Sequence, residues 1–102
     1  MAIKRLNPVM SAPVDMRFGV ASITIPAGDN NANVNVTYST PLPQNRNYAV
    51  FVQDNTYASP YTAQVMLQVR EKSYQRFNLF AITDGVFGNA VTHSVVYLAI
   101  AY

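Results

Sequence analysis

The stretch HSVVYLAIAY, positions 93–102, ends the sequence and contains eight consecutive apolar residues after Ser94. In a β-strand, successive side chains point to opposite faces of the sheet. The stretch therefore divides into two rows, which are Val95, Tyr97, Ala99 and Ala101 on one face and Val96, Leu98, Ile100 and Tyr102 on the other. Because both rows are apolar, neither face can lie in bulk water over its whole length. We expect a central strand that has the core on one side and a second cover on the other.

The second cover could be the N-terminal arm, a long loop, or another copy of the chain. A chain of 102 residues has few segments to spare for this purpose. Self-association is therefore the preferred interpretation, and small side chains would allow close approach near a symmetry axis. The predicted oligomer interface consists of Val95, Tyr97, Ala99, Ala101 and Tyr102. A central strand that is covered within one subunit remains the alternative.

Alternation of apolar and polar residues recurs upstream of this stretch and predicts further strands. The predicted strands occupy residues 14–25, 32–38, 48–52, 63–70, 76–82 and 91–101. The segments between them are rich in proline, glycine and asparagine, as turns are. No segment has the periodicity of a helix. The pattern predicts an all-β domain, a six- to seven-stranded antiparallel β-sandwich or, alternatively, a barrel.

The first predicted strand changes phase along its length. Its apolar residues fall on even positions up to Val20 and on odd positions from Ile23 onward. A shift of this kind is typical of an extra residue that bends the strand. We expect a bulge or bend near Ala21 and Ser22.

Residues 1–13 are predicted to form an extended arm that precedes a sandwich domain of residues 14–102. Pro8 and Pro13 interrupt any regular helix there. The arm nevertheless carries apolar side chains, which a solvated tail does not need. It either packs on its own domain or reaches a neighbouring subunit or partner. The residues expected to dock are Ile3, Lys4, Arg5, Leu6, Val9 and Met10.

Charge and hydropathy narrow the classes of partner. The net charge is only +2, 12% of residues are charged, and the basic residues are scattered. A nucleic-acid partner is not expected, because such proteins gather basic residues on one face. The N-terminal segment lacks the apolar core of a signal peptide, and no apolar run approaches the roughly 20 residues of a membrane helix. We therefore expect neither a secretory signal nor membrane insertion.

Few residues have the chemistry that catalysis or metal binding requires. There is no cysteine, His93 is the one histidine, and the five acidic residues are dispersed. A nucleophile with its base is therefore not expected, and the sequence predicts no enzyme. The oxygen-rich segments GDNN at 28–31 and TDG at 83–85 are ordinary turn sequences. We expect neither a metal ion nor a cofactor.

Three segments in order resemble H-type lectin domains. They are VNVTYSTPLPQNRNYAVFVQDN at 34–55, AQVMLQVREKSYQRFNLFAI at 63–82 and SVVYLAIAY at 94–102. Similar modules occur in bacteriophage tail-fibre tips and head-decoration proteins. The resemblance implies a six-stranded antiparallel sandwich that forms trimers through its sheet faces. Two departures are Tyr97, where the family usually has tryptophan, and AIAY in place of an ending like AIG.

The resemblance and the apolar ending together predict a homotrimeric head-decoration, or cement, subunit of a bacteriophage virion. It would assemble in the host cytoplasm and bind the major capsid protein or another virion protein. The alternative is a carbohydrate-binding adhesin or tail-fibre tip, and a third possibility is a cellular lectin or adaptor. In the adhesin, the contacts to a glycan would come from Tyr57, Tyr61, Arg70 and His93.

Overall fold

The computed structural model describes residues 14–56 and 65–102, and these form six strands and no helix. The strands are β1 (Asp15–Ile25), β2 (Asn31–Thr37), β3 (Tyr48–Asp54), β4 (Val65–Arg70), β5 (Arg76–Thr83) and β6 (Val91–Ala101). The predicted all-β, antiparallel sandwich is confirmed. The predicted arm, residues 1–13, and the candidate contacts Tyr57 and Tyr61 lie outside the described residues.

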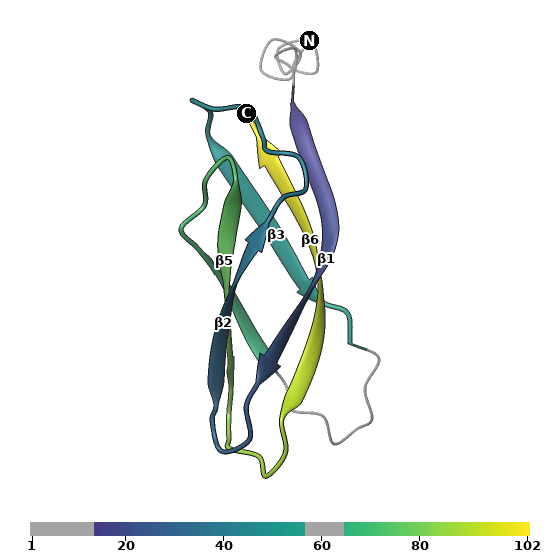
Figure 1. Ribbon diagram of the computed structural model, residues 1–102, viewed down its shortest axis with the longest axis vertical. Helices are drawn as coiled ribbons and strands as arrows, with labels where there is room; N and C mark the ends of the chain where they lie inside the picture. Colours follow the sequence, from purple (N-terminus) through teal and green to yellow (C-terminus); the bar gives the residue numbers. More distant parts are fainter. Residues whose placement is uncertain (1–13, 57–64) are drawn as a thin grey trace, which may run out of the picture.

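The strands form two antiparallel sheets of three strands each, in the orders β1-β6-β3 and β2-β5-β4 (Figure 1). Strand β1 packs opposite β2, and β3 packs opposite β4. The β4–β5 turn is the one connection that stays within a sheet, and every other connection crosses between the sheets. Strands from distant parts of the sequence therefore become neighbours, and the core lies between the layers.

The core is built from the inward-facing rows of the two central strands. Phe77, Leu79 and Ala81 of β5 are fully buried, and so are Val95, Ala99 and Ala101 of β6. Full burial of a large apolar side chain contributes roughly 1.5–3 kcal/mol to stability. The remaining buried apolar residues close the core around them; these are Ile23, Ile25, Val36, Tyr38 and Leu42.

The inner face of β6 corrects the predicted oligomer interface. Val95, Ala99 and Ala101 are 0% exposed within a single chain, and Tyr97 packs against the same core. Their cover is therefore the chain's own second sheet. Tyr102 lies beyond the end of β6 and is exposed. Alternation separated the two rows of β6 correctly, but it does not say which row faces the core.

Three aromatic rings pack against one another in the core. The ring of Phe77 lies 5.3 Å from that of Tyr97 and 6.0 Å from that of Tyr38, between centroids. The Tyr38 hydroxyl is buried without a hydrogen-bond partner among the described residues. Burial, and to a lesser extent Tyr97, raise the pKa of Tyr38 to about 12. This tyrosine therefore stays neutral at physiological pH.

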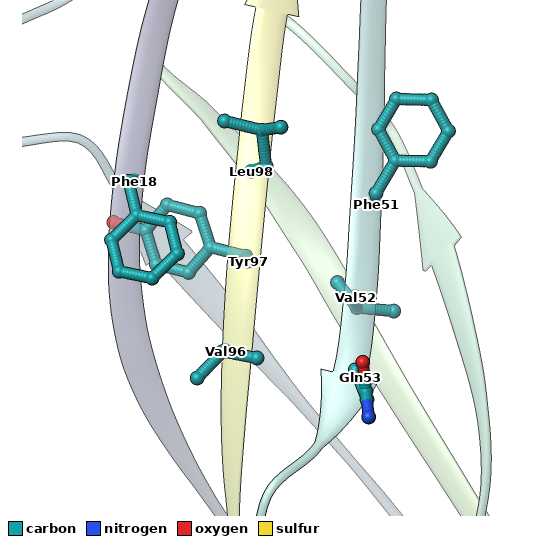
Figure 2. A pocket seen from close by; sticks show the side chains of 7 residues that line it. All are labelled: Phe18, Phe51, Val52, Gln53, Val96, Tyr97 and Leu98. Carbon is teal, nitrogen blue, oxygen red and sulfur yellow. The ribbon is translucent and has the colours of Figure 1, made fainter.

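Of the two expectations from the phase change in β1, a bulge or a bend near Ala21 and Ser22, the bulge is wrong. The register of β1 against β6 runs without a slip from the pair Asp15↔Ala101 to the pair Ile25↔Val91. The apolar side of β1 changes along the strand. In its first half the apolar side chains point outward, and in its second half they point into the core. Gly19 explains the switch, since a Cβ there would lie 2.5 Å from the Tyr97 hydroxyl oxygen. The Tyr97 ring, which reaches from β6 toward β1 in Figure 2, fills this part of the core instead.

Arg17 fastens one end of the sandwich. Its guanidinium donates hydrogen bonds to the carbonyl oxygens of Thr40, at 2.6 Å, and Pro41, at 2.7 Å. In the same loop, Leu42 is buried, and its amide donates to the Tyr74 carbonyl at 2.8 Å. The proline-rich loop between β2 and β3 is thereby held over the end of the core.

Replacing Gly19 with alanine should destabilise the fold by about 1–3 kcal/mol, because the new methyl group displaces the Tyr97 ring from a packed core. Chemical denaturation at a fixed protein concentration measures the loss. Gly88→Ala is the matched control, since a Cβ at Gly88 meets no atom within 4 Å, and its effect should stay within about 0.5 kcal/mol. Equal stability of the two variants would contradict the packing assigned to Tyr97.

Candidate interaction surface

The outer face of the β1-β6-β3 sheet carries aligned apolar side chains from all three strands. The register places Phe18 and Phe51 on either side of Leu98 (Figure 2). The neighbouring rows are Met16, Ile100 and Ala49 on one side and Val20, Val96 and Gln53 on the other. We call the apolar members of these rows the apolar outer face: Met16, Phe18, Val20, Ala49, Phe51, Val96, Leu98 and Ile100.

Much of the apolar outer face is in contact with water in a single chain. The exposed fractions are 74% for Phe18, 61% for Val20, 60% for Phe51 and 56% for Met16. Two phenylalanine rings of this exposure present roughly 250 Å² of apolar surface. Covering that surface is worth roughly 6 kcal/mol before the cost of association is subtracted. Contiguous apolar patches of this kind on soluble proteins mark interaction sites.

A shallow depression of ≈ 180 Å³ lies within the apolar outer face. Phe18 and Phe51 border it, and Val96 and Leu98 line it between them (Figure 2). Pockets for small ligands typically measure about 300–1,000 Å³ and enclose the ligand. The depression is better suited to a side chain that projects from an apposed protein surface.

The apolar outer face has a polar boundary and contains no charge. Toward the far end of the sheet, the outward pairs become Ser22↔Ser94 and Thr24↔Thr92, and the two threonine hydroxyls lie 2.8 Å apart. The outward positions of β1, β6 and β3 within these rows include no charged side chain. Covering the face therefore removes no charge from water, which would otherwise oppose association. An uncharged apolar area that passes into polar positions at one end is compatible with a protein interface.

His93 does not lie where a ligand contact was predicted. Its side chain is fully buried, and its Nδ1 lies 3.1 Å from Oδ2 of Asp54. The other carboxylate oxygen of Asp54 accepts hydrogen bonds from the Thr56 amide, at 3.0 Å, and the Thr56 hydroxyl, at 2.6 Å. The Thr56 hydroxyl oxygen in turn accepts from the Ser94 amide at 2.8 Å. His93 thus joins the end of β3 to β6, and it cannot reach a ligand in solution.

The Asp54 carboxylate is held in its charged form by this network. Burial by itself would raise the pKa of Asp54, but the hydrogen bonds from Thr56 and His93 outweigh burial and lower the pKa below its ordinary value of 3.8. The second nitrogen of His93, Nε2, is buried without a hydrogen-bond partner among residues 14–56 and 65–102. The network is therefore a structural clasp between two strands.

Arg70 alone among the predicted glycan contacts is both described and exposed. Its guanidinium carbon lies 4.0 Å from the centre of the Phe80 ring on the outer face of the β2-β5-β4 sheet. Tyr57 and Tyr61 lie outside the described residues. So do the six predicted docking residues of the arm, which fall between Ile3 and Met10. Phe18 and Phe51 were not predicted as surface residues, although the apolar even-numbered positions of β1 indicated an apolar face that includes Phe18.

Among residues 14–56 and 65–102, no three His, Asp or Glu side chains gather closely enough to hold a metal ion. Nor does this part of the chain contain a helix with the length and hydropathy needed to cross a membrane.

Two solved structures of bacteriophage tailspikes share the fold. The tailspike protein gp49 of Pseudomonas phage LKA1 matches 87% of the chain with a TM-score of 0.58 and 21% sequence identity. The tailspike gp61 of Pseudomonas phage phi297 matches 84% of the chain with a TM-score of 0.50 and 12% identity. The chain spans 15% of the length of each tailspike. At these identities the likeness establishes a common sandwich fold.

No protein-family model matches the sequence of the chain, and no curated protein matches it. The resemblance to H-type lectins therefore stays a prediction, while the fold itself occurs within proteins of the bacteriophage virion.

Asp54→Asn should make the stability of the protein less dependent on pH. Because the pKa of Asp54 is lower in the folded state, its contribution is complete above the ordinary pKa of 3.8 and disappears as the pH falls through the lower folded-state value. The free energy of unfolding of the variant at pH 6 should be about 1–2 kcal/mol lower than that of the parent. Urea denaturation from pH 6 to pH 2.5 should show the difference from the parent shrinking toward acid. A difference that stays constant over this range would contradict the assignment.

Proposed function

We propose that the protein is a non-enzymatic structural component of a bacteriophage virion that works as a homotrimer. The observation that carries the proposal is the apolar outer face, which leaves Phe18 and Phe51 largely exposed in a single chain. The sandwich fold that the chain has in common with two phage tailspikes supports the virion as its place. In this proposal, the apolar outer faces of the copies pack together around a shared axis.

A second copy of the chain fits the apolar outer face better than a small ligand does. The rows that form the face carry no charge, and its depression, which Phe18 and Phe51 border, is open enough to receive a side chain from another copy. Closed cyclic symmetry buries such a patch on every copy. No apolar patch is then left exposed on which further copies could add to form a filament. The central strand β6 would then be covered on both faces, by its own core and by neighbouring copies.

The absence of catalysis in this proposal rests on the environment of the one histidine. His93 is sealed in the interior by its clasp to Asp54, so it is not available as a general base for a substrate in solution. The four acids other than Asp54 lie in different strands or turns, and none is paired with another acid in a described hydrogen bond or ion pair; they are Asp15, Asp29, Glu71 and Asp84. The protein would therefore act through the surfaces that it buries.

The head-decoration role is one form of the proposal. A decoration trimer would hold its copies together through the apolar outer face and fasten to the capsid through the arm, residues 1–13. The apolar and basic residues of that segment give it a sequence suited to docking.

The tail role is the second form, and the neighbours in fold are about equally compatible with it. Both belong to tailspikes, in which a module of this size accounts for 15% of the chain. In the tail, the module would be a trimerising or receptor-binding part of a spike or fibre. Gold-labelled antibodies against the protein, imaged on intact virions, separate the two roles: label over the head supports decoration, label at the tail supports the spike or fibre, and unlabelled virions would contradict both.

The trimer is tested by a pair of substitutions on the apolar outer face. The parent protein should scatter light as a particle of about three times the chain mass of 11.3 kDa. Phe18→Ser combined with Phe51→Ser should weaken association by roughly 100-fold or more, because two exposed rings no longer contribute. Met66→Ser is the matched control, since Met66 is an equally exposed apolar residue on the opposite sheet. A monomeric parent at micromolar concentration would contradict the proposal.

The arm is tested by deleting residues 1–12. The sandwich should stay folded, because its core is built from residues of the six strands and the loops between them. Binding to capsids that lack the protein should be lost, as measured by co-sedimentation with the particles. Full occupancy by the truncated chain would show that the arm is not the anchor.

A further inference from the structure

The fold gathers the basic residues, which are scattered along the sequence, at one end of the sandwich. This is the upper end in Figure 1, where β1 begins and β6 ends, and we call it the basic end. Its basic residues are Arg17, Arg46, Arg70, Lys72 and Arg76. Two acidic residues, Asp15 and Glu71, lie there as well. The opposite end has Asp29, Asp54 and Asp84 and, among the described residues, no basic side chain.

The exposed cations of the basic end lie in and beside the turn between β4 and β5. They are Arg70, Lys72 and Arg76, and none of them forms an ion pair with another described residue. Arg17 differs from them, because its guanidinium nitrogens donate to backbone carbonyl groups. We call residues 70–76 the basic turn, and we propose that it docks on an acidic surface of another protein.

Ser73 holds the basic turn in one conformation. Its hydroxyl oxygen accepts hydrogen bonds from the amides of Gln75 and Arg76, each at 3.2 Å. Its amide donates to the Arg76 carbonyl at 2.9 Å. The Leu42 amide donates to the Tyr74 carbonyl at 2.8 Å and so joins the turn to the loop between β2 and β3. A turn that is ordered before it binds loses little conformational entropy in the complex.

Arg70 is also held in place. Its guanidinium carbon lies 4.0 Å from the centre of the Phe80 ring, and Oε1 of Gln68 accepts from Nε at 3.3 Å and from Nη2 at 3.2 Å. Its Nη1 has no described partner and can donate to a carboxylate. Arg70 pairs with Asn78 in the register, and Arg76 lies two positions before Asn78. The two arginines therefore occupy neighbouring rows on one face of the sheet.

The area of the basic end decides how it can be used. The molecule measures 29 Å by 18 Å across its long axis, so one end presents roughly 500 Å², less than the roughly 800 Å² per partner of a standard interface. Contact between the basic end of one copy and the acidic end of another would therefore be weak. Residues 1–13, which include Lys4 and Arg5, join β1 at the basic end. A partner on which this segment also docks can bury enough surface.

A protein surface suits the basic turn better than nucleic acid does. Glu71 is exposed within the turn, and Asp15 begins β1 at the same end. Both would repel a row of phosphates, whereas a protein surface can place its own cation against each of them. Strong binding to nucleic acid would also require more cations than the turn supplies. That the acidic partner is a virion protein is the one step that rests on the proposed function.

Titration of the full chain with poly-L-glutamate at low ionic strength tests the basic turn itself. The double variant Lys72→Gln, Arg76→Gln should bind roughly 10-fold more weakly than the parent, because two cations no longer attract carboxylates. The matched control is Ala27→Glu, Asn89→Glu, which lowers the net charge equally at exposed positions of the opposite end. The control should bind within roughly twofold of the parent, since salt screens charges at that distance.

Backbone amide NMR signals of residues 70–76 should shift during the titration, and the melting temperatures of the variants should match that of the parent. Three results would each overturn the inference. The first is an equal loss of binding in the two double variants, the second is shifts confined to other residues, and the third is tighter binding to duplex DNA of the same charge than to poly-L-glutamate.

Sedimentation with nuclease-treated virus particles that lack the protein tests whether the virion supplies the acidic surface. The parent and the control should sediment with the particles, and Lys72→Gln, Arg76→Gln should stay in the supernatant. A parent that does not sediment would contradict the proposed function, while the poly-L-glutamate titration still decides the role of the basic turn. Full sedimentation of Lys72→Gln, Arg76→Gln would show that the particles bind another part of the chain and would overturn the inference.

Discussion

Strand β6 pairs with a strand on each side and carries apolar side chains on both faces, and the rest of the structure follows from this constraint. An antiparallel sheet usually presents one apolar face to the core and one polar face to water. Here the inner row of β6 packs against β5 and completes the sandwich. The outer row is less buried, and its neighbours on β1 and β3, among them Phe18 and Phe51, are largely exposed within the described chain.

The two outer faces of the sandwich thus have different chemistry. The β1-β6-β3 face is apolar and free of charge, and it gains free energy by leaving water. The β2-β5-β4 face is lined with amides that hydrogen-bond to one another around Phe80 and Arg70. An amide surface is well solvated and gains little from burial. In the assembly that we propose, the β1-β6-β3 sheet holds the copies together and the β2-β5-β4 sheet faces outward.

The sequence predicts the strands well, because alternation at period two is a local signal that survives in the fold. The six strands occupy nearly the predicted positions. Alternation could not decide which row of β6 faces the core, since both rows are apolar. The phase change in β1 was misread as a bulge for a related reason: Gly19 is an inward position without a side chain, and its space is filled by Tyr97 from a strand more than seventy residues away.

The functional surfaces were harder to predict than the strands. His93 was predicted from the sequence to contact a ligand. Its partner Asp54 lies 39 residues earlier in the sequence and reaches it only through the pairing of β3 with β6. The hydrogen bonds from Asn78 to Asn33 and Asn35 likewise depend on the pairing of β2 with β5, two strands that are far apart in the sequence. Long-range register places these groups, and no local pattern encodes it.

The central claim is that neighbouring copies cover the apolar outer face, and two methionines test it most directly. Met16 lies on that face, and Met66 lies on the outer face of the β2-β5-β4 sheet. Both side chains are more than half exposed in a single chain. With dilute hydrogen peroxide and mass spectrometry, Met66 should oxidise fast at every protein concentration. Met16 should be protected at high concentration and lose its protection on dilution. Equal oxidation rates of Met16 and Met66 at all concentrations would contradict the account.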